Sequence, residues 1–207
     1  MLRKLSIAFI FLLNGILVNG QTMPVELMMG NNYGSVNFLT IRNFSPNSRL
    51  GLFNNNTIRF DYKDAGKNSF SLQDLLYVKI FKNLRVAGGV LCNSGGVMPT
   101  AGLQYVYSSK KLLFLIVPQV RINKNPSYSL LTILQYKQEI NDRIKLVGRV
   151  QLNNTFNAAG NIRSSQWMRI GMEVKGTQFG LAVNLDEKGP DPSVENNIGI
   201  YLKKDIL

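Results

Sequence analysis

The chain is 207 residues long, 45% hydrophobic and 17% charged, a size that suits one domain. It contains no histidine and one cysteine, which excludes Ser-His and Cys-His nucleophile pairs, histidine metal sites, thiolate clusters and an intramolecular disulfide. The formal net charge of +12 comes from basic residues that are dispersed along the chain, so we expect no nucleic-acid partner.

Residues 1–20 have the pattern of a secretory signal peptide. Arg3 and Lys4 precede an apolar stretch that begins at Ile7, and small or tolerated residues lead to a predicted cleavage before Gln21. An uncleaved membrane anchor fits less well, because Asn14 interrupts the stretch and a spanning helix needs about 20 apolar residues. We therefore predict a cleaved signal peptide over residues 1–20 and a single domain over residues 21–207.

The rest of the chain alternates apolar and polar residues with a period of two, which is typical of half-buried strands. The alternation is plainest over residues 100–108, 143–153, 166–175 and 177–186. Residues 112–117 and 130–134 are apolar on both faces, as in a strand with apolar neighbours on both sides. The predicted strands are residues 23–29, 34–43, 49–63, 72–81, 84–92, 97–107, 111–123, 127–139, 143–155, 164–175, 178–186 and 195–204.

The connections between these strands predict an all-β, up-and-down antiparallel barrel. Short links such as Lys82-Asn83 and Gly176-Thr177 suit tight hairpins, whereas residues 64–71, 156–163 and 187–194 suit longer loops. If the intermediate links are counted as long, long and short links alternate, which places the longer loops on one rim, as in transmembrane barrels. We expect about twelve strands, or ten or eight if the first segments form a plug or tail.

With this architecture the chain resembles small outer-membrane β-barrel proteins of Gram-negative bacteria, in particular the Asn- and Lys-rich barrels of Bacteroidota. The resemblance covers residues 21–207 and concerns architecture rather than a signature motif. It implies an outer-membrane location with lipid around the barrel. The chain departs from many such proteins at its end, where Leu207 stands in place of an aromatic residue.

The distribution of charge predicts which strand faces line the lumen. A Lys or Arg facing lipid at mid-bilayer costs about 2–4 kcal/mol, so mid-strand charges should face inward. The predicted inward bases exceed the predicted inward acids (Asp61, Glu139, Glu173 and Asp186) and would make the lumen positive and favourable to small anionic solutes. The bases are Arg59, Lys79, Arg85, Arg121, Lys137, Arg143, Lys145, Arg149, Arg169, Lys175 and Lys203. A lumen filled by paired side chains is the alternative.

No pattern indicates an enzyme or a cofactor. Asp186, Glu187, Asp191 and Glu195 cluster around one predicted loop, where a solvated acidic loop is the simpler interpretation than a Ca²⁺ site. Cys92 suits a buried or lipid-facing thiol. The leading hypothesis is an outer-membrane barrel that acts as a passive pore or as a structural component of the envelope. The alternative is a soluble exported β-barrel that binds a small apolar ligand.

Overall fold

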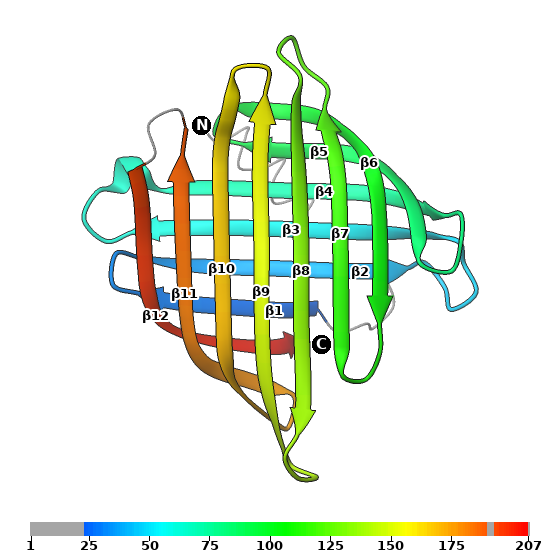
Figure 1. The fold of residues 1–207 in the computed structure, drawn as a ribbon, viewed down its shortest axis with the longest axis vertical. Coiled ribbons are helices and arrows are strands. Elements are labelled where there is room, and N and C mark those ends of the chain that lie inside the picture. The colour runs from blue at the N-terminus through cyan, green and yellow to red at the C-terminus, as the bar shows by residue number, and fades with distance from the viewer. Residues whose placement is uncertain (1–22, 190–192, 207) are drawn as a thin grey trace.

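The computed structural model describes residues 23–189 and 193–206, so the predicted signal peptide lies outside the described residues. Its strands form one closed antiparallel barrel in which each strand pairs with the next and β1 pairs with β12 (Figure 1). No helix within the described ranges is long and apolar enough to cross a membrane. The strands are β1 (Met23–Gly30), β2 (Tyr33–Asn43), β3 (Leu50–Asp61), β4 (Ser69–Lys79), β5 (Leu84–Asn93), β6 (Gly96–Ser108), β7 (Leu112–Arg121), β8 (Ser127–Glu139), β9 (Ile144–Asn157), β10 (Gly160–Val174), β11 (Thr177–Lys188) and β12 (Ser193–Ile206).

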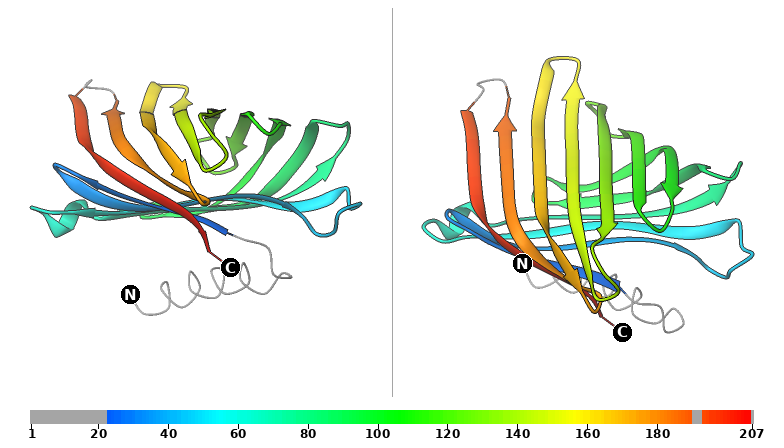
Figure 2. Two further views of the ribbon diagram at one scale, coloured as in Figure 1. Left: turned by 90° about the horizontal axis from the view of Figure 1, so that it is seen from below. Right: turned by 60° about the horizontal axis from the view of Figure 1, so that its bottom comes forward.

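The barrel is flattened rather than round. Strands β6–β12 form a curved wall that crosses over β1–β5 (Figures 1 and 2). The twelve-strand, up-and-down prediction is confirmed. The first strand, β1, is part of the closed wall and not a plug or tail, because it pairs with β12 from Met23 to Gly30 and with β2 from Val25 to Met29. Pro24 lacks an N–H, and it lies just beyond the β1–β2 ladder, where no bond to β2 is required.

The connections define two rims of the barrel. Links from an odd-numbered strand to the next even-numbered strand lie on one rim, called here the loop rim. The remaining links and both described ends, Met23 and Ile206, lie on the opposite rim, called here the terminal rim. The predicted loops 64–71, 156–163 and 187–194 therefore share the loop rim, as expected.

The predicted alternation of long and short links is wrong. Residues 156–163 are mostly strand, because Asn157 pairs directly with Gly160 across a two-residue turn and Gly160 adopts a φ of +120°. Strands β4 and β10 start three and four residues earlier than predicted, and β12 starts two residues earlier. Residues 44–49, between β2 and β3, form a longer link on the terminal rim. Asn and Gly in these segments favour turns locally, but the ladders continue through them.

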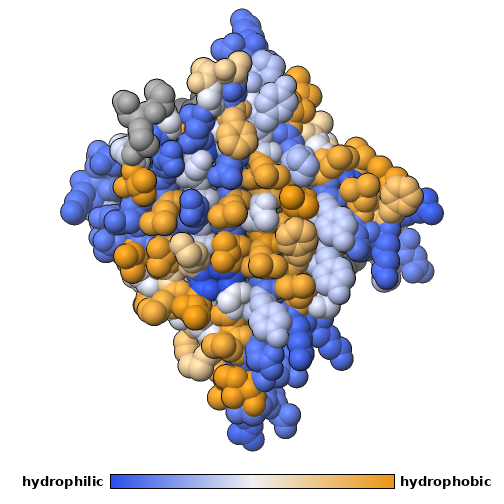
Figure 3. Space-filling view, viewed as in Figure 1, coloured by the Kyte–Doolittle hydropathy of each residue, from blue (hydrophilic) through white to orange (hydrophobic). Residues whose placement is uncertain are grey.

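The two strand faces differ in chemistry as the alternation predicts. Apolar side chains such as Leu76, Ile170 and Leu181 point outward and are 59%, 59% and 63% exposed. Figure 3 shows apolar residues spread over the wall formed by the front strands. The facing inward positions of the same strands carry buried polar groups such as Gln178 and Arg169. An outer surface of this kind marks contact with an apolar environment rather than with water.

One acidic residue breaks the apolar pattern of the outer face. Asp74 in β4 and Asn54 in β3 lie directly opposite each other on outward positions. The Asn54 side-chain amide donates a hydrogen bond to the Asp74 carboxylate. The expectation that mid-strand charges face only inward is therefore wrong at Asp74, and the amide partner lowers the cost of placing this carboxylate there.

Apolar side chains also fill one half of the interior. Phe53, Leu75, Leu115 and Ile133 are fully buried inside the barrel and form a cluster with five further residues from β4–β8: Tyr77, Ala87, Val106, Val117 and Leu131. This explains why residues 112–117 and 130–134 are apolar on both faces, since one face points outward and the other packs in this cluster. Buried polar side chains line the rest of the interior on strands all around the barrel, and some, such as Gln73, Gln104 and Gln119, belong to the same strands as this cluster.

Closure of the barrel predicts a specific cross-link. In a Cys92→Ser background, Leu27→Cys with Leu202→Cys should form a disulfide under mild oxidation, because these residues lie directly opposite across β1 and β12. Leu27→Cys with Lys204→Cys is the matched control, offset by two residues on the same face. Free-thiol titration in detergent measures both pairs. Equal oxidation of the two pairs would contradict the register, and no oxidation of either pair would contradict closure.

Candidate functional site

The interior contains two solvent-accessible vestibules, one at each rim. The loop-rim vestibule has a volume of about 250 Å³ and the terminal-rim vestibule about 370 Å³. A gap of about 10 Å³ lies between them, lined by residues that include Glu26, Arg149, Trp167 and Lys203. The gap shares Trp167 with the first vestibule and Lys203 with the second. A void of this size is about that of one water molecule, so the lumen is constricted midway along its length.

The constriction is built around one buried carboxylate. Arg169 donates from Nε to Oε1 of Glu26 at 2.9 Å, and Arg149 donates from Nη2 to Oε2 of Glu26. The side chains of Glu26, Arg149 and Arg169 are 3%, 8% and 1% exposed. Arg149 and Arg169 lie directly opposite each other on β9 and β10, and Lys203 on β12 lies directly opposite Glu26 on β1. One carboxylate thus stands among three cations, which leaves this level of the lumen positively charged.

Further contacts orient the Arg169 guanidinium. Its Nη1 donates to Oδ1 of Asn184 at 2.8 Å and to the carbonyl oxygen of Met168 at 2.9 Å. Arg169 shares the Glu26 carboxylate with Arg149, so its charge is only partly neutralised. Its hydrogen bonds to several further acceptors offset the cost of burying it. The constriction is therefore a rigid ionic cross-link between β1, β9 and β10.

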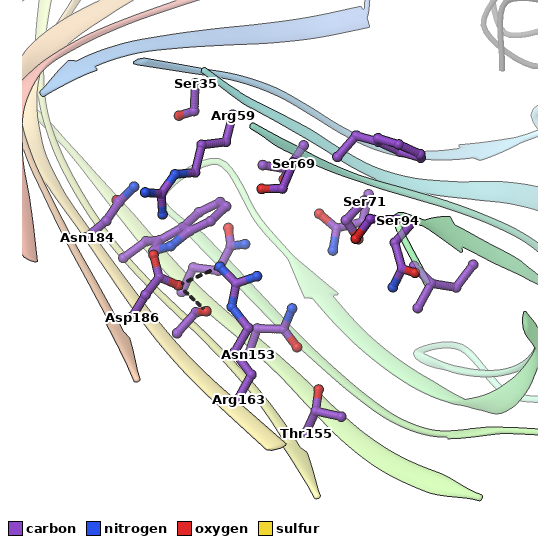
Figure 4. A pocket seen from close by; sticks show the side chains of 18 of the residues that line it. Ser35, Arg59, Ser69, Ser71, Ser94, Asn153, Thr155, Arg163, Asn184 and Asp186 are labelled. Atoms are coloured by element: carbon purple, nitrogen blue, oxygen red, sulfur yellow. Dashed lines mark hydrogen bonds and ion pairs between the residues drawn. The ribbon is translucent and has the colours of Figure 1, made fainter. Parts of the chain in front are cut away.

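The loop-rim vestibule is lined by hydroxyl, amide and guanidinium groups. Arg59 donates to Glu195 and Asp61 at 2.6 and 3.0 Å, and its guanidinium lies 3.7 Å from the ring centroid of Tyr33. Asp186 accepts from Arg163 at 2.9 Å and also from the hydroxyls of Ser165 and Tyr33 (Figure 4). These side chains project from β2, β3, β10, β11 and β12 toward a common space.

Arg121 adds a cation on the other side of the same vestibule. Its Nη2 donates weakly to the Thr155 hydroxyl at 3.4 Å, and its buried Nε has no partner among the described residues. Of the arginines that line this vestibule, Arg121 has no carboxylate partner within the described ranges, whereas Arg59 and Arg163 do. The vestibule can therefore attract an anion through Arg121.

The terminal-rim vestibule contains both paired and unpaired cations. Lys137 bonds to Glu173 at 2.6 Å, and Gln178 donates to the same carboxylate at 2.9 Å. Arg85 stacks on the ring of Tyr77 at 4.3 Å, and its Nε and Nη1 are buried without a hydrogen-bond partner in the described part of the chain.

The structure places most of the predicted lumen residues in the interior and two of them in exposed turns. Arg59 and Arg121 line the loop-rim vestibule, and Arg149, Arg169 and Lys203 surround the constriction. Arg85, Lys137 and Glu173 lie at the terminal-rim vestibule, which Lys203 also lines. Lys79 lies beside Arg85, and Lys145 bonds to the half-exposed Glu139 near the terminal rim. The two others are exposed in turns on the terminal rim: Arg143 between β8 and β9, and Lys175, with a φ of +49°, between β10 and β11.

The central carboxylate, Glu26, was not predicted from the sequence. Glu26 lies in a segment with weak alternation, and its partners are 123 and 143 residues away along the chain. Pro24, Glu26 and Met28 alternate with Val25, Leu27 and Met29, and this polar position in an otherwise apolar segment is the signal that could have identified it. Trp167 was also missed, since an indole on a polar face gives no charge pattern.

The charged side chains of the lumen act on solutes through electrostatic attraction. Within residues 23–189 and 193–206 there is no group of three or more Cys, Asp or Glu side chains placed to hold a metal ion. The carboxylates that line the lumen are mostly engaged by cations, as at Glu26, Glu173 and Asp186. At the constriction, cationic side chains therefore outnumber carboxylates.

Comparisons with known proteins concern the fold. No protein-family model and no curated protein sequence matches this chain. Among solved structures, a KdgM porin in complex with disordered oligogalacturonate aligns with a TM-score of 0.52 and 10% identity, over 90% of this chain and 99% of that one. A second KdgM porin structure aligns with a TM-score of 0.50 and the same identity and coverage. A NanC porin aligns with a TM-score of 0.49 and 12% identity, over 91% of this chain and 100% of that one. The chain therefore has the closed-barrel architecture of outer-membrane porins.

Proposed function

We propose that this chain is an outer-membrane β-barrel, exported with cleavage of residues 1–20, that acts as a passive pore with a preference for small anionic solutes. The observation that carries the proposal is the polar lumen with its two vestibules and its excess of cations around Glu26. Because Arg149, Arg169 and Lys203 share one carboxylate at the narrowest level, an anion there meets a favourable potential. We propose no catalytic role and no cofactor.

The outer face supports lipid as the surroundings of the barrel. Its exposed apolar side chains extend from Leu27 and Met29 on β1 to Leu202 on β12. This distribution disfavours the alternative of a soluble exported barrel, which would place its apolar faces inward. An origin in a Bacteroidota-type bacterium is part of the proposal and rests on the resemblance in composition and architecture.

The class of solute is proposed from charge and from a structural neighbour. One of the KdgM porin structures is a complex with oligogalacturonate, an anionic oligosaccharide. The loop-rim vestibule of this chain combines arginines with Ser, Thr and Asn side chains that can hydrogen-bond to oxygen-rich solutes (Figure 4). We propose small anions as the solutes of this pore.

A second candidate function is a structural envelope component with a filled lumen. The narrowness of the gap at Glu26 and the apolar cluster around Leu115 favour it. The two functions differ in one observable, since a filled barrel passes no ions whatever its charge, whereas a narrow pore conducts with a selectivity set by the groups at the constriction.

The proposed membrane orientation predicts accessibility at the two rims. In a Cys92→Ser background, Lys67→Cys and Ala158→Cys on the loop rim should react with a membrane-impermeant maleimide on intact Gram-negative cells. Asn47→Cys and Asp142→Cys on the terminal rim should react only after the outer membrane is permeabilised, because both described ends of the chain lie on this rim and the termini face the periplasm in such barrels. Labelling of both rims on intact cells would contradict the orientation. Recovery of the protein outside the outer-membrane fraction would contradict the location.

Ion selectivity tests the pore directly. Lys203→Glu changes the charge beside Glu26, so in planar bilayers the reversal potential should move toward cation preference while conductance is retained. Lys204→Glu is the matched control, because it makes the same charge change one residue further along β12 on the outward face. Equal shifts in both variants would argue against a selective constriction, and an absence of current in the wild type would favour the filled barrel.

A further inference from the structure

The terminal-rim vestibule contains a buried cation that no described group neutralises. Arg85 is 9% exposed and lines this vestibule. Its Nε and Nη1 atoms are buried and unpartnered within the described ranges. The other charged side chains at the vestibule are Lys137 and Glu173, which pair with each other, Lys203 toward Glu26, and Asp205 near the chain end. Buried guanidinium nitrogens normally have acceptors, so these two atoms indicate a missing anionic partner.

The Arg85 guanidinium is held in place rather than free to move away. It lies 4.3 Å from the ring centroid of Tyr77, and the Tyr77 hydroxyl donates to Oδ1 of Asn43 at 2.8 Å. Gln104 lies directly opposite Arg85 on β6, is fully buried, and has no partner for either side-chain polar atom among the described residues. A stacked, preorganised guanidinium can receive a carboxylate with two parallel hydrogen bonds.

The wall beside Arg85 is apolar, unlike the walls of the loop-rim vestibule. Leu39, Ile41, Val106 and Leu113 line the terminal-rim vestibule. Val106 belongs to the apolar cluster inside the barrel, and the other three pack against that cluster. The cluster thus serves as filler around Leu115, but at this end it presents an open apolar edge next to an unpaired cation. A water-filled channel alone does not require this combination.

We propose that the terminal-rim vestibule is a binding site for a small amphiphilic monocarboxylate, a molecule with one carboxylate on an apolar chain or ring. The carboxylate pairs with the Arg85 guanidinium, and the apolar body packs against Leu39, Ile41, Val106 and Leu113. The vestibule volume of about 370 Å³ falls at the lower end of small-molecule sites, roughly 300–1,000 Å³. This proposal goes beyond the proposed pore, because binding at one vestibule does not require passage through the constriction.

Binding can be measured on the refolded full barrel in neutral maltoside micelles. The probe is 4-(trifluoromethyl)benzoate, observed by ¹⁹F NMR, and protein-free micelles are the blank. Octanoate, which has its carboxylate on an apolar chain, is the competitor. Wild-type protein should give a saturable shift that octanoate displaces. The neutral analogue 4-(trifluoromethyl)benzyl alcohol lacks the carboxylate, and acetate has a carboxylate with only a methyl group. Each should therefore bind at least about tenfold more weakly.

Variants assign the site to its residues. Arg85→Gln should weaken benzoate binding about tenfold through loss of the charged hydrogen bonds, and Leu113→Asn should weaken it through loss of apolar contact. Arg143→Gln, the same change in an exposed turn on the same rim, is the matched control and should bind like the wild type. Folding of each variant is checked on gels, where its unboiled and boiled samples should differ in mobility as those of the wild type do.

Three outcomes would overturn the proposal: no saturable shift in the wild type, equal weakening in Arg85→Gln and Arg143→Gln, or equal affinity for the acid and its neutral alcohol. The comparison of acid and alcohol uses only wild-type protein, so it decides the matter even if Arg85→Gln does not fold. Failure of binding leaves the ion currents of the pore unaffected, and an absence of current leaves binding unaffected, so the two proposals fail separately.

Discussion

Pairing of β1 with β12 is the constraint on which the rest of this structure depends. In a closed antiparallel barrel the wall has no free edge strand, and every side chain points either inward or outward. The same closure brings Glu26, near the start of the described chain, between Arg149 and Arg169 on the far side of the lumen. The β1–β12 pairing and the constriction at Glu26 are therefore structurally linked. The ionic cross-link spans the interior next to the strand pair that closes the wall.

The interior combines two ways of satisfying buried groups. On one side, fully buried side chains such as Phe53 and Ile133 pack as a core does, which stabilises the flattened shape without polar partners. On the other side, charges are neutralised pairwise, as at Lys137–Glu173 and Arg163–Asp186. The cations left over, chiefly Arg85 and Arg121, line the vestibules. This division leaves positive potential where solutes can reach it.

Local pattern allowed most of the wall to be predicted from the sequence. Alternation over residues 166–186 predicted which side chains of β10 and β11 face inward and which face outward. The segments that are apolar on both faces predicted that β7 and β8 contact apolar groups on both sides. The predicted strand ends were wrong at residues 156–163. Asn and Gly favour turns locally, but the ladder of β9 and β10 continues through them. The partners of Glu26 and the unpaired state of Arg85 arise from closure and flattening, which bring together residues far apart in the chain and leave no trace in any one segment.

The central claim is that polar faces point into the lumen and apolar faces point to lipid, and tryptophan quenching tests it most directly. The single tryptophan, Trp167, lines the interior, whereas its neighbour Met168 points outward and is 38% exposed. In vesicles with brominated acyl chains, Trp167 fluorescence should be nearly unquenched. In a Trp167→Phe, Met168→Trp variant, the fluorescence should be strongly quenched, because successive strand residues face opposite sides. Strong quenching of Trp167 together with an unquenched Met168→Trp would reverse the faces and contradict the account.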